Sequence, residues 1–144
     1  LPIATILLLA LALGGVSKAL GTGVFVASLV GETLPAWLLP ACLFLASGFI
    51  AFAVGSSWGT FSIMLPIAVP VASALGVDPT LLVAAVLSGG IFGDHSSPIS
   101  DTTIVSSLAS GTEHIQHVST QLPYALLAGG VSIIGFLMLG LILL

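Results

Sequence analysis

The last twenty-three residues of the chain, Leu122 to Leu144, contain no charged side chain. An α-helix needs about 20 predominantly apolar residues to cross the hydrocarbon core of a bilayer, so this run can span it with some tilt. A second charge-free run of nineteen residues extends from Ala36 to Val54. Both runs restrict the chain to folds that satisfy their backbone hydrogen bonds inside a bilayer, which favours helices.

The composition agrees with a membrane protein. Charged residues make up 4% of the 144 residues and the mean hydropathy is +1.32, whereas soluble domains carry about 25% charged residues. Lys18 is the one basic residue of the chain, so a Lys/Arg bias between loops cannot assign the orientation. The net charge of −4 argues against nucleic acid as a partner. We therefore predict an all-α, multi-pass protein whose partner is the lipid bilayer.

The pattern of apolar runs and polar interruptions predicts a single membrane domain over residues 1–144. The expected segments are a spanning helix at about 1–19, a short helix at about 23–31, a helical hairpin at about 36–75 with its tip at 55–60, a broken helix at about 79–110 with its break at 93–102, and a final spanning helix at about 121–144. The chain begins inside an apolar run without Met or a basic leader. This beginning favours a segment of a larger protein over a signal peptide.

The hairpin and the broken helix are predicted from arms that are too short to span. The apolar arm after the tip, Phe61 to Leu75, has fifteen residues, or about 22 Å against a hydrocarbon core of ~30 Å. This length favours a re-entrant hairpin, with two complete spans as the alternative. Non-helical backbone at membrane depth is tolerated where it is buried in protein or lines a cavity, and paired interruptions of this kind point to a transporter site.

Two carboxylates, Asp94 and Asp101, lie in the expected break, within the stretch GGIFGDHSSPISDTT of residues 89–103. Each costs about 2.5–3.5 kcal/mol to insert at bilayer depth, and no Lys or Arg is near to neutralise it. A helix that ends near Asp94 places its negative pole beside that carboxylate, which favours a bound proton or metal cation. Asp101 has a structural alternative as the N-cap of the following helix. We expect both to bind ions or protons, with Asp94 the stronger candidate.

Hydroxyl side chains accompany these carboxylates and complete the predicted ion and proton site. They are Ser97, Ser100 and Thr102 in the break, and Ser56, Ser57 and Thr60 at the hairpin tip. Hard cations such as Na⁺ prefer oxygen ligands. Burial raises the pKa of carboxylates in general, so one carboxylate can hold either a proton or a cation. We therefore expect Na⁺ and H⁺ as transported ions, with no cofactor and no transition metal.

Three other features have competing interpretations. His95 is either a proton relay or an imidazole that supports the loop through a backbone carbonyl. Trp58 at the hairpin tip is interpreted as a packing residue, with ligand contact as the alternative. The stretch from Gly111 to Thr120 is interpreted as an extramembrane connection, and its motif Glu113-His114-x-x-His117 as a solvated loop rather than a pair of metal ligands, because no third His or Cys lies in reach.

Two enzymatic alternatives are disfavoured. Residues 55–59 match the G-x-S-x-G motif, but that motif requires a strand before it, and an apolar helical run precedes this one. Asp94 and Asp101 could share a proton and activate water as in an intramembrane aspartyl protease. The G-x-G-D pattern of that class is absent, since Ile91 occupies the place of its first glycine. A non-transporting assembly subunit is the structural alternative.

Three longer stretches carry the most specific sequence pattern, namely GSSWGTFSIMLP at residues 55–66, FGDHSSPISDTTI at 92–104 and HVSTQLPYA at 117–125. In these stretches the chain resembles the C-terminal half of the NhaC-type sodium/proton antiporters of the ion transporter superfamily. The resemblance implies an elevator-like transporter of two inverted repeats, not an enzyme, in which the hairpin tip and the helix break face each other at one midplane site. Relatives of this family also carry organic acids such as malate and lactate, or amino acids, coupled to sodium.

The resemblance leads to a specific expectation. This chain would be the C-terminal repeat of the transporter, and its missing partner would be the N-terminal repeat of the same transporter. A homo-oligomer is a further option. The expected location is a bacterial or archaeal cell membrane. Its function would be sodium/proton antiport, by competition of Na⁺ and H⁺ for a midplane carboxylate site. A sodium-coupled organic acid or amino acid exchanger is the main alternative, and the intramembrane protease a remote one.

Overall fold

The computed structural model describes residues 34–144 continuously and, before them, residues 8, 12, 15–16, 18–22, 24–25 and 28. The spanning helix expected at about 1–19 and the short helix expected at about 23–31 therefore lie for the most part outside the described residues. From residue 34 onward every regular element is a helix. The prediction of an all-helical chain is confirmed for this part.

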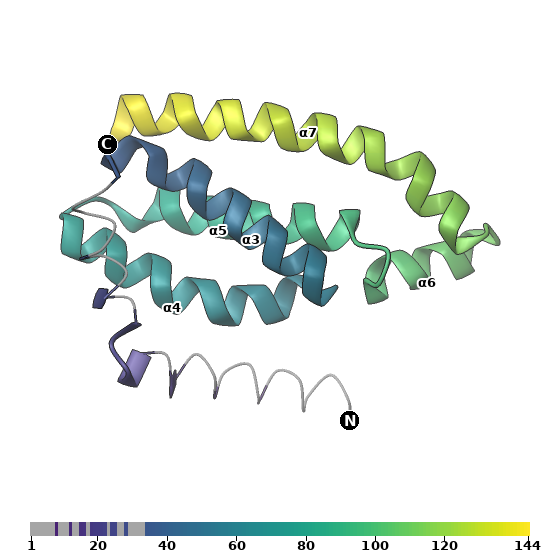
Figure 1. Ribbon diagram of the computed structural model, residues 1–144, viewed down its shortest axis with the longest axis horizontal. Helices are drawn as coiled ribbons and strands as arrows, with labels where there is room; N and C mark the ends of the chain where they lie inside the picture. Colours follow the sequence, from purple (N-terminus) through teal and green to yellow (C-terminus); the bar gives the residue numbers. More distant parts are fainter. Residues whose placement is uncertain are drawn as a thin grey trace.

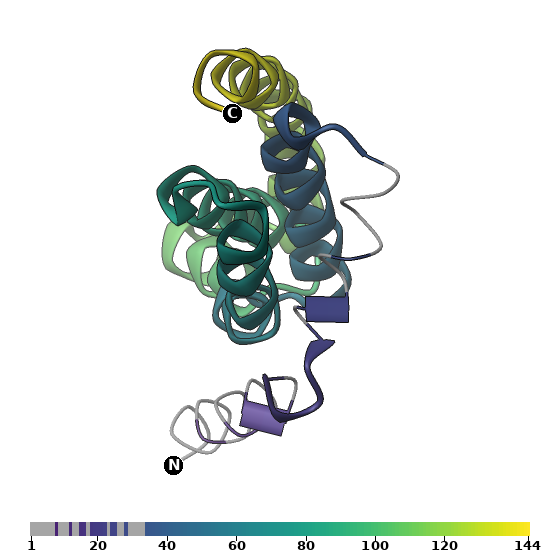
Figure 2. The ribbon, with the colours of Figure 1, turned by 90° about the vertical axis from the view of Figure 1, so that its left-hand side faces the viewer.

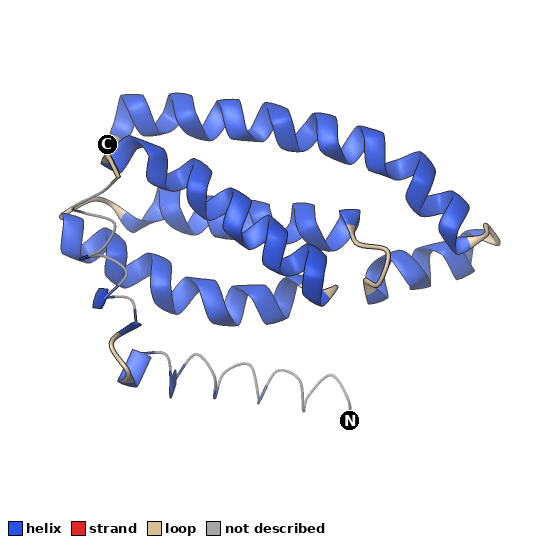
Figure 3. Cartoon of the chain, viewed as in Figure 1, coloured by secondary structure: helices blue, strands red, loops and turns tan. Residues whose placement is uncertain are grey.

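The described helices follow one another with short connections (Figures 1 and 3). A 3₁₀ turn, η1 (Ala36–Leu38), leads into α3 (Leu39–Val54), which is followed by α4 (Ser57–Leu75), α5 (Pro79–Ser96), α6 (Asp101–Ser110) and α7 (His114–Leu143). Three segments among the described residues are long and apolar enough to cross a membrane by length and composition, namely Ala36–Val54, Ser57–Leu75 and His114–Leu143.

Two boundaries differ from the sequence-based expectation. The turn between α3 and α4 consists of Gly55 and Ser56, because the Ser56 side chain accepts a hydrogen bond from the Gly59 amide and caps α4 there. Helix α4 thereby gains residues 57–60 and reaches nineteen residues, about 28 Å at ~1.5 Å per residue. The short-arm argument for a re-entrant hairpin therefore no longer holds. Helix α7 begins at His114, within the stretch that was expected to be a connection.

The most extensive helix contact among the described residues is the crossing of α3 and α5 in the middle of the bundle (Figures 1 and 2). Gly89 and Gly93 of α5 lie directly against the carbonyl oxygens of Phe44 and Gly48 of α3, where a Cβ atom would collide with them. Small residues allow two helix backbones to approach in this way. The close crossing fixes the C-terminal half of α5 against the middle of α3.

Helices α4 and α7 pack on different parts of this central pair. Met64 and Ala68 of α4 join a buried cluster with Leu82 and Val86 of α5. From α7, Phe136 packs against Phe44 with ring centroids 5.5 Å apart. These contacts bury Leu82 and Val86 of α5 against α4 and join α7 to α3.

The predicted break after α5 is shorter than expected. The sequence places it at residues 93–102, but α5 continues through Gly93 to Ser96 and α6 begins at Asp101. The segment Ser97–Ser100, called the linker below, is the non-helical part. Asp94 therefore lies in the last helical turn of α5 rather than in a loop.

Candidate ion and proton site

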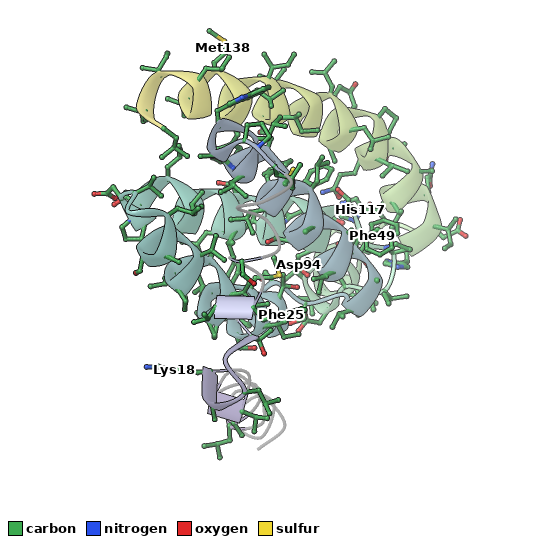
Figure 4. The ribbon with its side chains drawn as sticks, turned by 60° about the vertical axis from the view of Figure 1, so that its left-hand side comes forward. Lys18, Phe25, Phe49, Asp94, His117 and Met138 are labelled. Carbon is green, nitrogen blue, oxygen red and sulfur yellow. The ribbon has the colours of Figure 1, made fainter. Side chains whose placement is uncertain are left out.

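Asp94 is a buried carboxylate that three hydroxyl groups approach. Its side chain is 2% exposed, and Figure 4 shows it within the bundle, whereas Met138 lies on the outer side of α7. The Ser100 hydroxyl donates to Oδ1 at 2.7 Å. The hydroxyls of Ser57 and Thr102 each donate to Oδ2 at 3.3 Å. These four residues, Asp94, Ser57, Ser100 and Thr102, are called the Asp94 cluster below.

The cluster joins the consecutive helices α5 and α6 to α4, which lies further back in the chain. Ser57 is the first residue of α4, Thr102 is the second residue of α6, and Ser100 is the N-cap of α6. Helix N-termini carry a partial positive charge, which stabilises a carboxylate nearby. Asp94 itself lies near the C-terminal, negative pole of α5. The two N-termini and the hydroxyl donors offset that pole. The protein itself therefore stabilises the carboxylate, whereas the sequence alone suggested only a bound proton or cation.

Ser100 uses its hydroxyl for the cluster instead of for its own helix. It is fully buried, and no hydrogen bond from its side chain caps α6. Its hydroxyl is also 2.7 Å from that of Thr102. Because an N-cap serine ordinarily satisfies an amide of the first turn, this redirection costs α6 a cap. The geometry shows that the linker is arranged around the carboxylate.

The other three predicted hydroxyl residues have different partners. Ser97, fully buried, donates to the backbone carbonyl of Phe52 at 2.7 Å and so ties the linker to α3. Ser56 caps α4, and the buried Thr60 donates to the carbonyl of Ser56 at 3.0 Å. None of these bonds reaches Asp94. Ser56, Thr60 and Ser97 hold the segments that carry the cluster.

Asp101 and His95 lie at the surface next to the cluster. Asp101 is exposed and is the first residue of α6, so Ser100 and not Asp101 holds the N-cap position. His95 is also exposed, and its Nδ1 donates to the carbonyl of Ile91 at 3.0 Å. That bond is the loop-supporting interaction considered from the sequence, although it lies within α5. It leaves Nε2 of His95 directed away from this carbonyl.

Trp58 lies beside the turn between α3 and α4 with 67% of its surface exposed. Its ring meets the edge of Phe61 at a centroid distance of 6.1 Å. The segment before this turn is a helix, so the G-x-S-x-G match lacks the strand that a hydrolase requires.

Ser107 hydrogen-bonds to both histidines of the E-H-x-x-H motif, His114 and His117. Ser107 was not identified as a candidate from the sequence. Its hydroxyl is 3.2 Å from Nδ1 of His114 and 2.7 Å from Nδ1 of His117, and His114 also reaches the carbonyl of Pro98 through Nε2 at 2.6 Å. The motif was expected to be a solvated loop. The signal that could have revealed the contact is the i, i+3 spacing, which places both imidazoles on one face of a helix.

The arrangement can bind a proton or a hard cation. A carboxylate and three hydroxyls offer oxygen atoms only, the donor type that Na⁺ prefers. Among the residues that the structure describes, no group of three or more His, Cys, Asp and Glu side chains is placed to hold a metal ion. A site of the kind that zinc requires is therefore not seen in this part of the chain.

Comparison with known proteins identifies relatives. The family described as "Na+/H+ antiporter family" matches residues 1–141. The arginine/ornithine antiporter ArcD of Halobacterium salinarum is 36% identical over 74% of this chain and 22% of its own length. The malate-2H(+)/Na(+)-lactate antiporter of Bacillus subtilis is 33% identical over 74% and 22%. The Na(+)/H(+) antiporter NhaC of Alkalihalophilus pseudofirmus is 30% identical over 81% and 30%.

The chain thus spans less than a third of the length of each of these curated relatives. No solved structure matches it. The three relatives are named as antiporters, which are transporters and not enzymes. With three helices among the described residues long and apolar enough to cross a bilayer and a family match over nearly its whole length, the chain is a membrane protein that belongs to the Na+/H+ antiporter family.

Proposed function

We propose that this chain forms part of a secondary active transporter that exchanges Na⁺ for H⁺ at Asp94. The observation that carries the proposal is the buried Asp94 carboxylate with three hydroxyls directed at it. Asp94 is the group that changes partner. Ser57, Ser100 and Thr102 provide the remaining oxygen ligands.

Competition for one carboxylate is sufficient for exchange. When Asp94 is protonated, its charge is neutral and Na⁺ has no anionic partner in the cluster. When the proton leaves, the carboxylate and the hydroxyl oxygens can replace part of the hydration shell of Na⁺. A hydroxyl can turn its hydrogen away and offer a lone pair, since it is both donor and acceptor. The same residues therefore serve both states, and neither ion acts as a cofactor.

The proposal also concerns the membrane architecture. We place α3 and α4 as a re-entrant hairpin and α5 and α6 as a broken helix that meet at Asp94 near the bilayer midplane. The convergence of the α4 and α6 N-termini on one carboxylate supports this arrangement. A second repeat, contributed by the rest of the transporter, would cover the site from the other side. The relatives' greater length is consistent with such a partner, and a bacterial or archaeal cell membrane is the expected location.

The test is ion exchange by the complete transporter in proteoliposomes. An imposed Na⁺ gradient should drive a change of internal pH, and Asp94→Asn should remove it. The matched control is Asp101→Asn, because Asp101 is exposed and outside the cluster. Internal pH traces that are independent of Na⁺ in the unmodified protein would refute Na⁺/H⁺ exchange.

A sodium-coupled exchanger of organic acids or amino acids is the second candidate. It is favoured by the named activities of two relatives, an arginine/ornithine antiporter and a malate/lactate antiporter. A substrate carboxylate would need a cationic or hydrogen-bonding group, and this chain offers hydroxyls, helix N-termini and His95. Uptake of labelled malate, lactate or arginine that depends on Na⁺, with no Na⁺-driven proton movement, would favour this function over the first.

A further inference from the structure

We infer that His114 is a positioning residue for the Asp94 cluster. The inference rests on the proposed function and identifies a residue that acts through the linker without touching Asp94. The decisive contact is the 2.6 Å hydrogen bond from Nε2 of His114, at the start of α7, to the backbone carbonyl of Pro98. Pro98 lies two residues before Ser100, whose hydroxyl donates to Asp94.

The linker is held on one side by α3. The Ser97 hydroxyl donates to the carbonyl of Phe52. Gly55, with φ at +73°, lies so close to the linker that a Cβ atom there would be 2.8 Å from the carbonyl oxygen of Ile99. These contacts fix the two residues on either side of Pro98. They leave the Pro98 carbonyl itself to be fixed by another group, and His114 is the group that reaches it.

The hydrogen-bond chemistry defines the state of His114. A carbonyl oxygen can only accept, so Nε2 of His114 must carry the hydrogen. Nδ1 on the other side of the ring is 3.2 Å from the hydroxyl of Ser107. Ser107 is 1% exposed and also lies 2.8 Å from the carbonyl of Thr103 on α6. Its hydroxyl has one hydrogen, which it can donate to that carbonyl or to an imidazole nitrogen, but not to both at once. The ring of His114 is therefore held between a fixed hydroxyl of α6 and the linker.

This arrangement transmits the position of α7 to the ion site. If the bond to Pro98 is lost, the linker keeps its attachment to α3 but gains freedom on the side that leads to Ser100. The hydroxyl of Ser100 would then meet Asp94 in only a fraction of molecules, which weakens the affinity for Na⁺. His117 provides an internal comparison, because its ring bonds to Ser107 rather than to the linker.

Two substitutions of His114 separate its two hydrogen bonds. The amide nitrogen of Gln occupies about the position of Nε2 and can reach Pro98, whereas that of Asn matches Nδ1 and can reach only Ser107. In proteoliposomes of the complete transporter, His114→Asn should raise the Na⁺ concentration for half-maximal proton flux by about three- to tenfold, the effect of one hydrogen bond. Its maximal rate should stay near that of the unmodified protein. His114→Gln and the control His117→Gln should retain the original value.

Hydrogen–deuterium exchange at the amides of Ile99 and Ser100 is the second measurement, and it does not depend on transport. Exchange there should accelerate in His114→Asn and not in His114→Gln. The inference is overturned if Asn and Gln behave alike in both measurements, or if His114→Asn lowers only the melting temperature and the maximal rate. Should the unmodified transporter show no Na⁺-dependent flux, the proposed function fails, and the exchange data still decide whether His114 holds the linker.

Discussion

The hydroxyl of Ser100 donates a 2.7 Å hydrogen bond to Oδ1 of Asp94 across the linker that separates α5 from α6. Both residues are buried. The bond connects the last turn of one helix to the N-cap of the next, so the non-helical backbone between them is organised by the carboxylate. A buried polar group in an apolar bundle is costly unless it is hydrogen-bonded. An ionisable side chain such as Asp94 is also costly to place within a membrane, and this cost is the physical reason to regard the Asp94 cluster as a functional site.

Asp94→Asn should abolish Na⁺-driven proton movement while leaving insertion into the membrane intact. An amide can still accept hydrogen bonds from the hydroxyls, but it neither binds a proton at neutral pH nor neutralises a cation. Fluorescent measurement of internal pH, normalised to the protein in the membrane, checks this.

Asp101→Asn is the matched control for that substitution. Asp101 is exposed at the N-terminal turn of α6, where a negative charge contributes about 0.3–1 kcal/mol. We expect a modest loss of affinity or stability with exchange retained. An Asp94→Asn protein with the original Na⁺ affinity would contradict the role of that carboxylate.

Ser100→Ala and Ser97→Ala should have separable effects, although the sequence places both hydroxyls in the ion site. A hydrogen bond to a charged group contributes about 1.5–3 kcal/mol, so Ser100→Ala should weaken Na⁺ binding by roughly tenfold or more. Ser97 donates instead to the carbonyl of Phe52. Its replacement should lower the melting temperature and change Na⁺ affinity less. Titration of the two variants with Na⁺ checks the difference, and equal losses of affinity would show that Ser97 binds the ion.

Much of the fold could be predicted from the local pattern. Charge-free runs predicted the helices α3 and α7, and the polar stretch after Phe92 predicted an interruption before α6. The errors are at the helix ends. Ser56 caps α4 and makes residues 57–60 helical, while α5 continues through Gly93 because that glycine packs against α3. Both effects depend on contacts that apolar periodicity does not contain.

The candidate site could be predicted only in its residue types. The excess of hydroxyls near Asp94 was visible in the sequence, but which of them reach the carboxylate depends on the crossing of α3, α4 and α5. Ser57 and Ser100 do reach it, whereas Ser56 and Ser97, each a close neighbour in the chain, bond elsewhere. The side chains of neighbouring residues point in different directions, so composition alone cannot tell which hydroxyls reach Asp94.

Asp78 should make the stability of the protein decrease at acidic pH. The hydroxyl and the backbone amide of Thr80 hydrogen-bond its carboxylate at the start of α5 and lower the pKa of Asp78 below its ordinary value. A group with a lowered pKa in the folded state stabilises the fold above its unfolded pKa of ~3.9, and this contribution is lost as the pH falls through the folded value.

Thermal unfolding in detergent between pH 6 and pH 3 checks the effect of Asp78. The unmodified protein should lose more stability over this interval than Asp78→Asn, since the amide keeps the cap without a titrating charge. Identical pH dependence of the two proteins would assign the acid sensitivity to other carboxylates.

Gly93→Ala should destabilise the bundle by about 1–3 kcal/mol, the usual cost of overpacking. An added methyl group would collide with the carbonyl oxygen of Gly48 and lie 2.8 Å from the Cβ of Ala51, so α3 and α5 would have to separate next to Asp94. Gly130→Ala in α7 is the control, because nothing lies within 4 Å of its added methyl group. Alanine also favours a helix over glycine by about 1 kcal/mol. Melting temperatures in detergent should fall for Gly93→Ala and hold or rise for Gly130→Ala; equal shifts would contradict the close crossing.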